Sequence, residues 1–161
     1  QGPAGNDGFD GATGPMGPQG PAGAGGNLAF YSVSGYGQNP QQSLDFIGPT
    51  VTVTIVNGQA VFMVSSKALG SSQIGGGTDL GLYACSRSTD AGTIQQYGGG
   101  SLGLRVGQDT RTMFNINWVF TGLPSGIYEL GMCGQSSNAS TWDSNEFGYI
   151  SALVGDQSGP I

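Results

Sequence analysis

Histidine is absent from this chain of 161 residues, and charged side chains of any kind make up only 9% of it. The lack of histidine removes the most common general base and the most common zinc ligand, and no nucleophile or phosphate-loop motif replaces them. Four basic residues against ten acidic ones give a net charge of -6, which does not suit a nucleic-acid partner. The sequence therefore predicts a protein that is not an enzyme, needs no cofactor or metal ion, and binds no nucleic acid.

Long apolar runs are also missing, and cysteine is scarce. No stretch reaches the roughly 18 apolar residues of a membrane span, so we expect no membrane insertion by this part of the protein. The only cysteines are Cys85 and Cys133, each inside an apolar, strand-like run. In an exported protein this pair is a candidate disulfide, whereas two buried free thiols are the alternative, and the sequence does not decide between them.

Glycine, in contrast, is abundant and periodic. It occupies every third position from Gly2 to Gly26, nine times in strict register. This is the repeat of the collagen triple helix, in which three polyproline-II chains meet at an axis that only glycine can approach. Residues 1–26 are therefore predicted to be a collagen-like stalk segment, and the protein to be a homotrimer.

The prolines of the repeat point to the source of the chain. All four directly follow a glycine, and none stands in the third place of a triplet, where animal collagens carry hydroxyproline. That placement favours a chain made without prolyl hydroxylase, and hence a bacterial, phage or viral source. A triple helix of eight triplets is weak alone, so we expect a longer stalk upstream and a head that holds three chains in register.

Residues 27–161 have the composition of one turn-rich β domain. Two runs of β-formers, 51–56 and 59–64, flank Asn57-Gly58 and predict a two-residue hairpin. The alternation at 113–120 predicts a half-buried strand. Eight or nine short strands without a helix predict an all-β, antiparallel β-sandwich or jelly-roll-like trimeric head. The remaining strands are expected at 28–33, 44–47, 80–85, 102–106, 127–133 and 149–154, with glycine-rich turns at 70–79, 97–101 and 122–126.

Two sets of residues are candidates for ligand binding in this head. Trp142 stands in the polar segment 136–148, where its ring face would serve as a platform for a sugar; the alternative is that it fills the edge of the core. Each basic residue would be present three times in a trimer, and guanidinium groups suit sulfate or carboxylate oxyanions. The alternative is that the basic residues are solvated or ion-paired. They are Lys67, Arg87, Arg105 and Arg111.

With a stalk that reads GPA-GND-GFD-GAT-GPM-GPQ-GPA, followed by a glycine-rich β domain, the chain resembles the bacterial collagen-like surface proteins, including adhesins of the Legionella type. The resemblance implies a C-terminal head that trimerises the stalk, lies outside the cell or on its surface, and binds sulfated glycosaminoglycans during attachment and biofilm formation. Two functions are thus expected. One is a trimeric adhesin head that binds sulfated or acidic polysaccharides, and the other is a purely structural module that nucleates the triple helix.

Overall fold

The computed structural model describes residues 1–2, 28–56, 58–90 and 92–157. The predicted stalk at 1–26 lies almost entirely outside the described residues. No helix in the described ranges is long and apolar enough to cross a membrane. The secondary structure consists of β1 (Ala29–Gly35), β2 (Asp45–Ile55), β3 (Gln59–Ser71), β4 (Gly77–Ser88), β5 (Ile94–Val106), β6 (Thr110–Phe120), β7 (Gly126–Ser136), the 3-10 turn η1 (Ala139–Thr141) and β8 (Ser144–Asp156).

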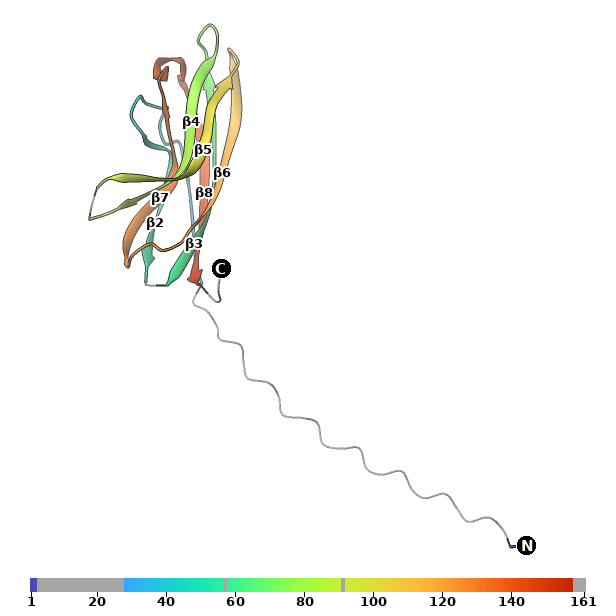
Figure 1. Ribbon diagram of the computed structural model, residues 1–161. Helices are drawn as coiled ribbons and strands as arrows, with labels where there is room; N and C mark the ends of the chain where they lie inside the picture. Colours follow the sequence, from blue (N-terminus) through green and yellow to red (C-terminus); the bar gives the residue numbers. More distant parts are fainter. Residues whose placement is uncertain (3–27, 57, 91, 158–161) are drawn as a thin grey trace.

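These strands form two four-stranded antiparallel sheets packed face to face (Figure 1). Sheet A has the order β1-β8-β3-β6, and sheet B has the order β2-β7-β4-β5. Most successive strands change sheet, so the chain wraps around the interior as it does in a jelly roll. The prediction of an all-β sandwich of jelly-roll type is confirmed.

Alternation along each strand builds the core between the sheets. In β2, for example, Val51, Val53 and Ile55 are buried, whereas the threonines between them are exposed. Inward residues gather in one cluster around Phe120 and in another around Trp142, and Ile116 packs against both. The interior is therefore continuous along the sandwich.

The predicted hairpin at Asn57-Gly58 is wrong, although a tight turn is present. The Gln59 N–H donates to the Val56 carbonyl at 3.1 Å, and Gly58 has a φ of 84°. The strands on either side, however, enter opposite sheets, because β2 pairs with β7 while β3 pairs with β6 and β8. Both strands direct every second residue into the same core, and this period of two is identical for a hairpin and for two strands that face each other.

Two further boundaries differ from the expectation. The segments 44–47 and 51–56 belong to one strand, β2, with an irregularity between Phe46 and Thr50. The glycine run at 97–101, predicted as a turn, lies inside β5, where Gly98 and Gly100 have positive φ and the pairing with β4 is interrupted. Glycine here produces bulges within a strand instead of ending it.

Candidate functional site

The two cysteines join neighbouring strands of sheet B. Cys85 on β4 and Cys133 on β7 form a disulfide, with their Cα atoms 5.8 Å apart. Both are fully buried on the outer side of the sheet, where Phe46 and Tyr83 pack against them. This structure therefore has no free thiol at either position. A bridge across 48 residues stabilises the fold by about 4 kcal/mol in the loop-entropy account.

Lys67 is buried and does not lie on the surface. Its ammonium donates to the backbone oxygens of Tyr36 and Glu146 and to Oδ1 of Asn145. Gly148, its partner on β8, leaves room for the lysine stem. Burial lowers the pKa of Lys67 to about 8, despite the opposing effect of Glu146. The prediction that Lys67 binds an external anion is wrong, because all three of its donors are used inside the domain.

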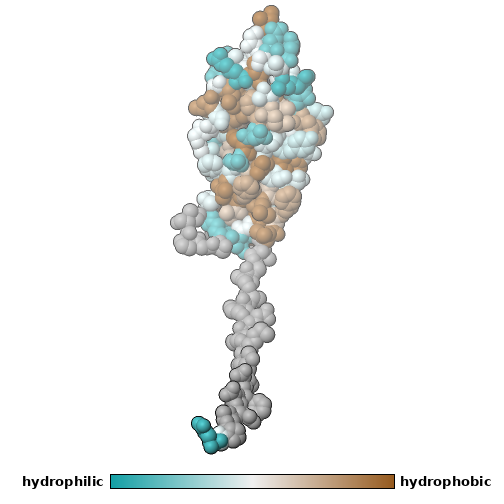
Figure 2. All heavy atoms as spheres, turned by 90° about the vertical axis from the view of Figure 1, so that its right-hand side faces the viewer, coloured by the Kyte–Doolittle hydropathy of each residue, from teal (hydrophilic) through white to brown (hydrophobic). Residues whose placement is uncertain are grey.

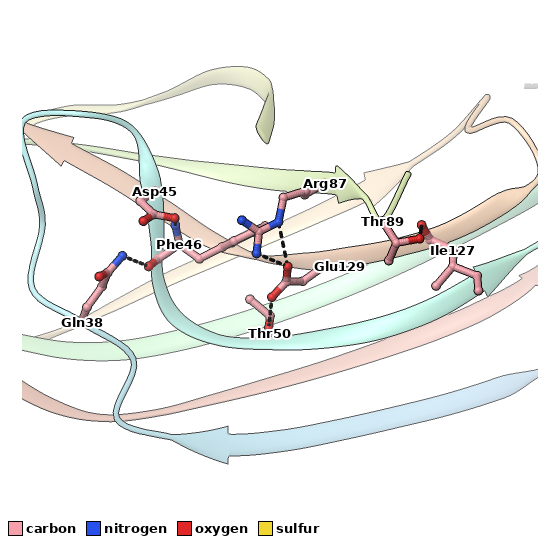
Figure 3. A network of polar contacts seen from close by, with 8 residues as sticks. All are labelled: Gln38, Asp45, Phe46, Thr50, Arg87, Thr89, Ile127 and Glu129. Atoms are coloured by element: carbon pink, nitrogen blue, oxygen red, sulfur yellow. Dashed lines mark hydrogen bonds and ion pairs between the residues drawn. The ribbon is translucent and has the colours of Figure 1, made fainter. Parts of the chain in front are cut away.

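Arg87 is paired within sheet B (Figure 3). Its Nε donates to Glu129 Oε2 at 2.9 Å, and its Nη2 donates to the same oxygen. Thr50 Oγ1 donates to the other carboxylate oxygen at 2.7 Å. The guanidinium carbon also lies 5.3 Å from the centre of the Phe46 ring, a cation–π contact. A carboxylate from the same domain therefore already balances the charge of Arg87.

The remaining two arginines lie near the turn between β5 and β6. The exposed Arg111 forms an ion pair with Glu146 through its Nε. Arg105 is exposed, and no ion pair joins it to another described residue. Arg87 lies far from this turn, because it is near the end of β4 and pairs with Ile94 at the start of β5. The buried Lys67 and the exposed Arg111 both contact Glu146, but the four basic residues do not form a single site.

Trp142 belongs to the core, so its prediction as an exposed sugar platform is wrong. Its side chain is 2% exposed, and its Nε1 donates to the Thr78 carbonyl at 2.9 Å. Its ring meets Phe114 edge-on, with the ring centres 6.2 Å apart. Gly77 packs directly on the indole, since a Cβ there would lie 2.9 Å from it. The alternative interpretation, that Trp142 fills the edge of the core, is correct.

Hydrogen bonds within the domain organise the polar part of segment 136–148. Asp143 accepts from the hydroxyl and the N–H of Ser72, at 2.5 Å and 2.7 Å, and from the side-chain amide of Gln73 at 2.6 Å. These bonds, the Ser72 hydroxyl foremost, lower the pKa of Asp143 to about 2. Among the described residues no three His, Cys, Asp or Glu side chains are grouped to hold a metal ion.

The outer face of sheet A carries an apolar row followed by uncharged polar rows, and its ion pair, Arg111–Glu146, lies near the opposite end of β6 and β8. One row of exposed side chains crosses all four strands in register, and it consists of Phe30, Leu153, Phe62 and Val119, which are 38 to 69% exposed. The next two rows contain only serine, asparagine, valine and tyrosine. On the side on which β6 lies, hydrophobic residues are interspersed with neutral and hydrophilic ones (Figure 2). Three successive rows of this sheet therefore present no charge to the outside.

The outer face of sheet B carries a hollow that the sequence does not reveal. Its volume is about 330 Å³, and Asp79, Tyr83, Leu102 and Gln135 are among its lining residues. These side chains come from the consecutive strands β4 and β5 and from β7, which follows only after β6, so no single sequence motif contains them. In segment 136–148 the sequence pointed to Trp142, whereas the residue of that segment that lines the hollow is Ser137.

No family model and no curated protein matches this chain. Among solved structures it is similar to the structure of infectious bursal disease virus Gx strain, with 14% identity over 84% of this chain and 34% of that one, and a TM-score of 0.41. The VP2 subviral particle of the same virus gives 15% identity over 81% and 33%, with a TM-score of 0.43. The chain spans about a third of the length of these viral proteins. A likeness at this level carries no argument about function.

Proposed function

We propose that residues 27–161 form the trimerisation head of a collagen-like stalk, and that three copies meet through the outer face of sheet A. The observation that carries this proposal is the exposed apolar row of that sheet, with uncharged rows beside it, and the edge strand β1 of the sheet begins three residues after the last glycine of the repeat. Depletion of charge and enrichment of aromatic residues characterise the buried centre of protein interfaces. Large apolar patches of this kind are seldom left open to water on a monomer.

The two outer faces differ in a way that favours sheet A. The outer face of sheet B carries the Arg87–Glu129 ion pair and the Asp79 carboxylate, and burying such groups between copies would be costly. Sheet A also has an ion pair, Arg111–Glu146, but it lies at the start of β6 and β8, whereas the apolar row crosses these strands near their ends. In sheet A the apolar row that contains Phe30 and Phe62 lies near the start of β1, on the side from which the repeat enters. Copies joined through this row would hold three stalk chains close together.

The collagen-like repeat indicates that other copies of this chain cover the outer face of sheet A. A Gly-X-Y sequence forms its helix only with two further chains, so triple-helix formation brings three copies of β1 close together. Association of the heads in turn raises the local concentration of the stalk chains and fixes their register. The head and the stalk would therefore stabilise each other.

A charge placed in the apolar row tests this proposal. In the chain 1–161 we expect light scattering to give the mass of three chains for the wild type, and of one chain for Phe62→Glu, with the triple-helix signal in circular dichroism lost. Ile127→Glu is the matched control, because Ile127 is as exposed as Phe62, 45% against 47%, but lies on β7 of sheet B. A second variant, Val119→Glu, should behave like Phe62→Glu. Trimers that persist in both sheet A variants, or a monomeric wild type, would overturn the proposal.

Binding of sulfated or acidic polysaccharides by a surface-exposed adhesin head is the second candidate function. One observation favours it: Arg105 is exposed and has no ion pair with a described residue. In a trimer this arginine would be present three times, so three weak contacts could act together on one polymer. Such a role is compatible with trimerisation and would place the protein outside the cell.

A further inference from the structure

The hollow on the outer face of sheet B has the size and the position of a site for a small ligand. Its volume of about 330 Å³ is at the lower end of the range for small-molecule sites. Gly81 on β4 and Gly103 on β5 keep it open, while Gln42 and Ser137 approach from the segments beside β2 and β7. The hollow lies on the face opposite to the one we assign to trimerisation, so three copies would remain accessible in a trimer.

Tyr83 offers an unused hydroxyl at this hollow. The residue is only 8% exposed, yet its hydroxyl forms no hydrogen bond with any described residue. Glycines hold the ring in place, because a Cβ at Gly100 would lie 2.4 Å from a ring carbon and one at Gly81 would lie 3.2 Å from the hydroxyl. Most of the Tyr83 ring is buried, but its hydroxyl oxygen is not among the fully buried atoms without a partner, so it can donate to and accept from a molecule in the hollow.

Asp79 lines the hollow from β4. Its φ of 57° lies in the left-handed region, which aspartate and asparagine adopt more readily than most other residues with a side chain. Its Oδ2 accepts from the Ser137 hydroxyl, whereas its Oδ1 has no partner among the described residues. The carbonyl just before it, that of Thr78, accepts from both Trp142 and Ser136. The buried Trp142 is thus a positioning residue for Asp79.

Two amides complete the polar wall. Neither Gln42 nor Gln135 forms a side-chain hydrogen bond with a described residue, so each has a donor and an acceptor to offer. A bridge between Gln41 and Gln135, together with the Ser136 N–H bond to the Gln41 carbonyl at 2.8 Å, fixes this segment beside β7. Leu102, 66% exposed, adds an apolar contact.

We propose that this hollow binds one neutral sugar residue. A carboxylate, two amides and a phenol match the alternating donors and acceptors of ring hydroxyls, and Leu102 suits the apolar C–H patch of a sugar. The Asp79 carboxylate disfavours sulfated or acidic sugars at the same place, because two like charges would meet. This inference goes beyond trimerisation and does not depend on it.

The test uses the chain 1–161 and the methyl glycosides of glucose, galactose, mannose and N-acetylglucosamine, titrated by two-dimensional NMR. We expect at least one glycoside to bind with a dissociation constant near the millimolar range, with shifts at Tyr83, Leu102 and Gln135. Asp79→Asn should weaken binding at least about tenfold, since a hydrogen bond to a charged group is lost. Asparagine tolerates the left-handed conformation, so the backbone is retained. Asp109→Asn is the matched control, because Asp109 has a similar φ of 54° and does not line the hollow.

Further variants and ligands test whether the hollow binds independently of trimerisation and which class of sugar it binds. Gln135→Leu should also weaken binding at least about tenfold, while the monomeric Phe62→Glu should bind the glycoside like the wild type. Absence of binding by all four glycosides, or wild-type affinity in both Asp79→Asn and Gln135→Leu, would overturn the proposal. Tighter binding of methyl glucuronide than of methyl glucoside would overturn the assignment to a neutral sugar.

Discussion

Lys67 places a positive charge in the interior of the domain, where an ammonium is costly unless every donor has a partner. Two backbone carbonyls and the Asn145 side chain supply three acceptors for its three donors. The lysine thereby connects the segment after β1 with the start of β8. At the scale of single residues it acts as a structural clamp and not as a ligand-binding cation.

Because Lys67 is buried, the free energy of unfolding varies with pH in the alkaline range. The pKa of Lys67 is about 8 in the folded state against an ordinary value of 10.5, so between these values the unfolded chain binds more protons than the folded one. The free energy of unfolding therefore rises with pH in this window, and the share of Lys67 is about 2 kcal/mol between pH 7 and pH 10. We expect the urea midpoint of the wild type to rise relative to that of Lys67→Met over this range. Midpoints that run parallel would contradict the lowered pKa.

Burial explains which residue roles the sequence did not predict. For the cysteine pair the sequence left a disulfide and two buried free thiols open, since apolar runs fit both, and the structure has the disulfide. Lys67 was assigned to the surface because of its charge alone, although the alternation that begins at Val61 and Met63 places it on the inward face of β3. Trp142 follows no alternating strand pattern, so its burial depends on contacts with β4 and β6 that only the folded chain makes.

At the scale of elements, glycine determines the shape of β5. Gly98, Gly100 and Gly103 all have positive φ, and the pairing with β4 is interrupted along the same stretch. These bulges leave space on the outer face of sheet B, where the Tyr83 ring packs on Gly100. Strand β5 therefore helps to form the hollow, and its glycines allow the bulges that shape it.

Two neighbouring glycines of β5 give a matched pair for a stability test. At Gly100, with φ of 66°, an added Cβ would lie 2.4 Å from the Tyr83 ring, whereas at Gly99 it would meet nothing within 4 Å. We expect Gly100→Ala to lower the free energy of unfolding by at least about 2 kcal/mol, and Gly99→Ala to change it by less than about 1 kcal/mol. Chemical denaturation measures both. Equal effects would show that the backbone of β5 relaxes freely around Tyr83.

The strand segments could be predicted from the sequence, but their pairing could not. Every predicted strand overlaps one of the eight and extends at most one residue beyond it at either end, because alternation and β-branched residues reflect a half-buried strand wherever it pairs. Sheet membership depends on which long-range partner is available, and the turn after Val56 fits either choice. The prediction of a turn at 97–101 was wrong for a related reason, since glycine with positive φ occurs in turns and in bulges alike.

At the scale of the whole molecule, the two outer faces are suited to different tasks. Sheet A presents three uncharged rows, and sheet B presents an ion pair, a hollow and a carboxylate. If sheet A is buried between copies, the polar face of each head points outward and every surface group is repeated three times. Weak contacts on sheet B would then add up on a multivalent ligand.

Charge limits what such a trimer does with an acidic polymer. Each chain carries a net charge of -6, and of its four cations Lys67 is buried while Arg87 and Arg111 are paired, so only Arg105 is available. We therefore expect heparin to bind the trimer at low salt and to lose that binding near 0.15 M salt, because exposed charges are screened over about 8 Å there. Arg105→Glu should abolish the low-salt binding, and monomeric Phe62→Glu should reduce it strongly, as surface plasmon resonance on immobilised heparin would measure. If Arg105→Glu still bound heparin, the polymer would contact a site other than Arg105. If binding did not change with salt concentration, charge would not be what holds the polymer.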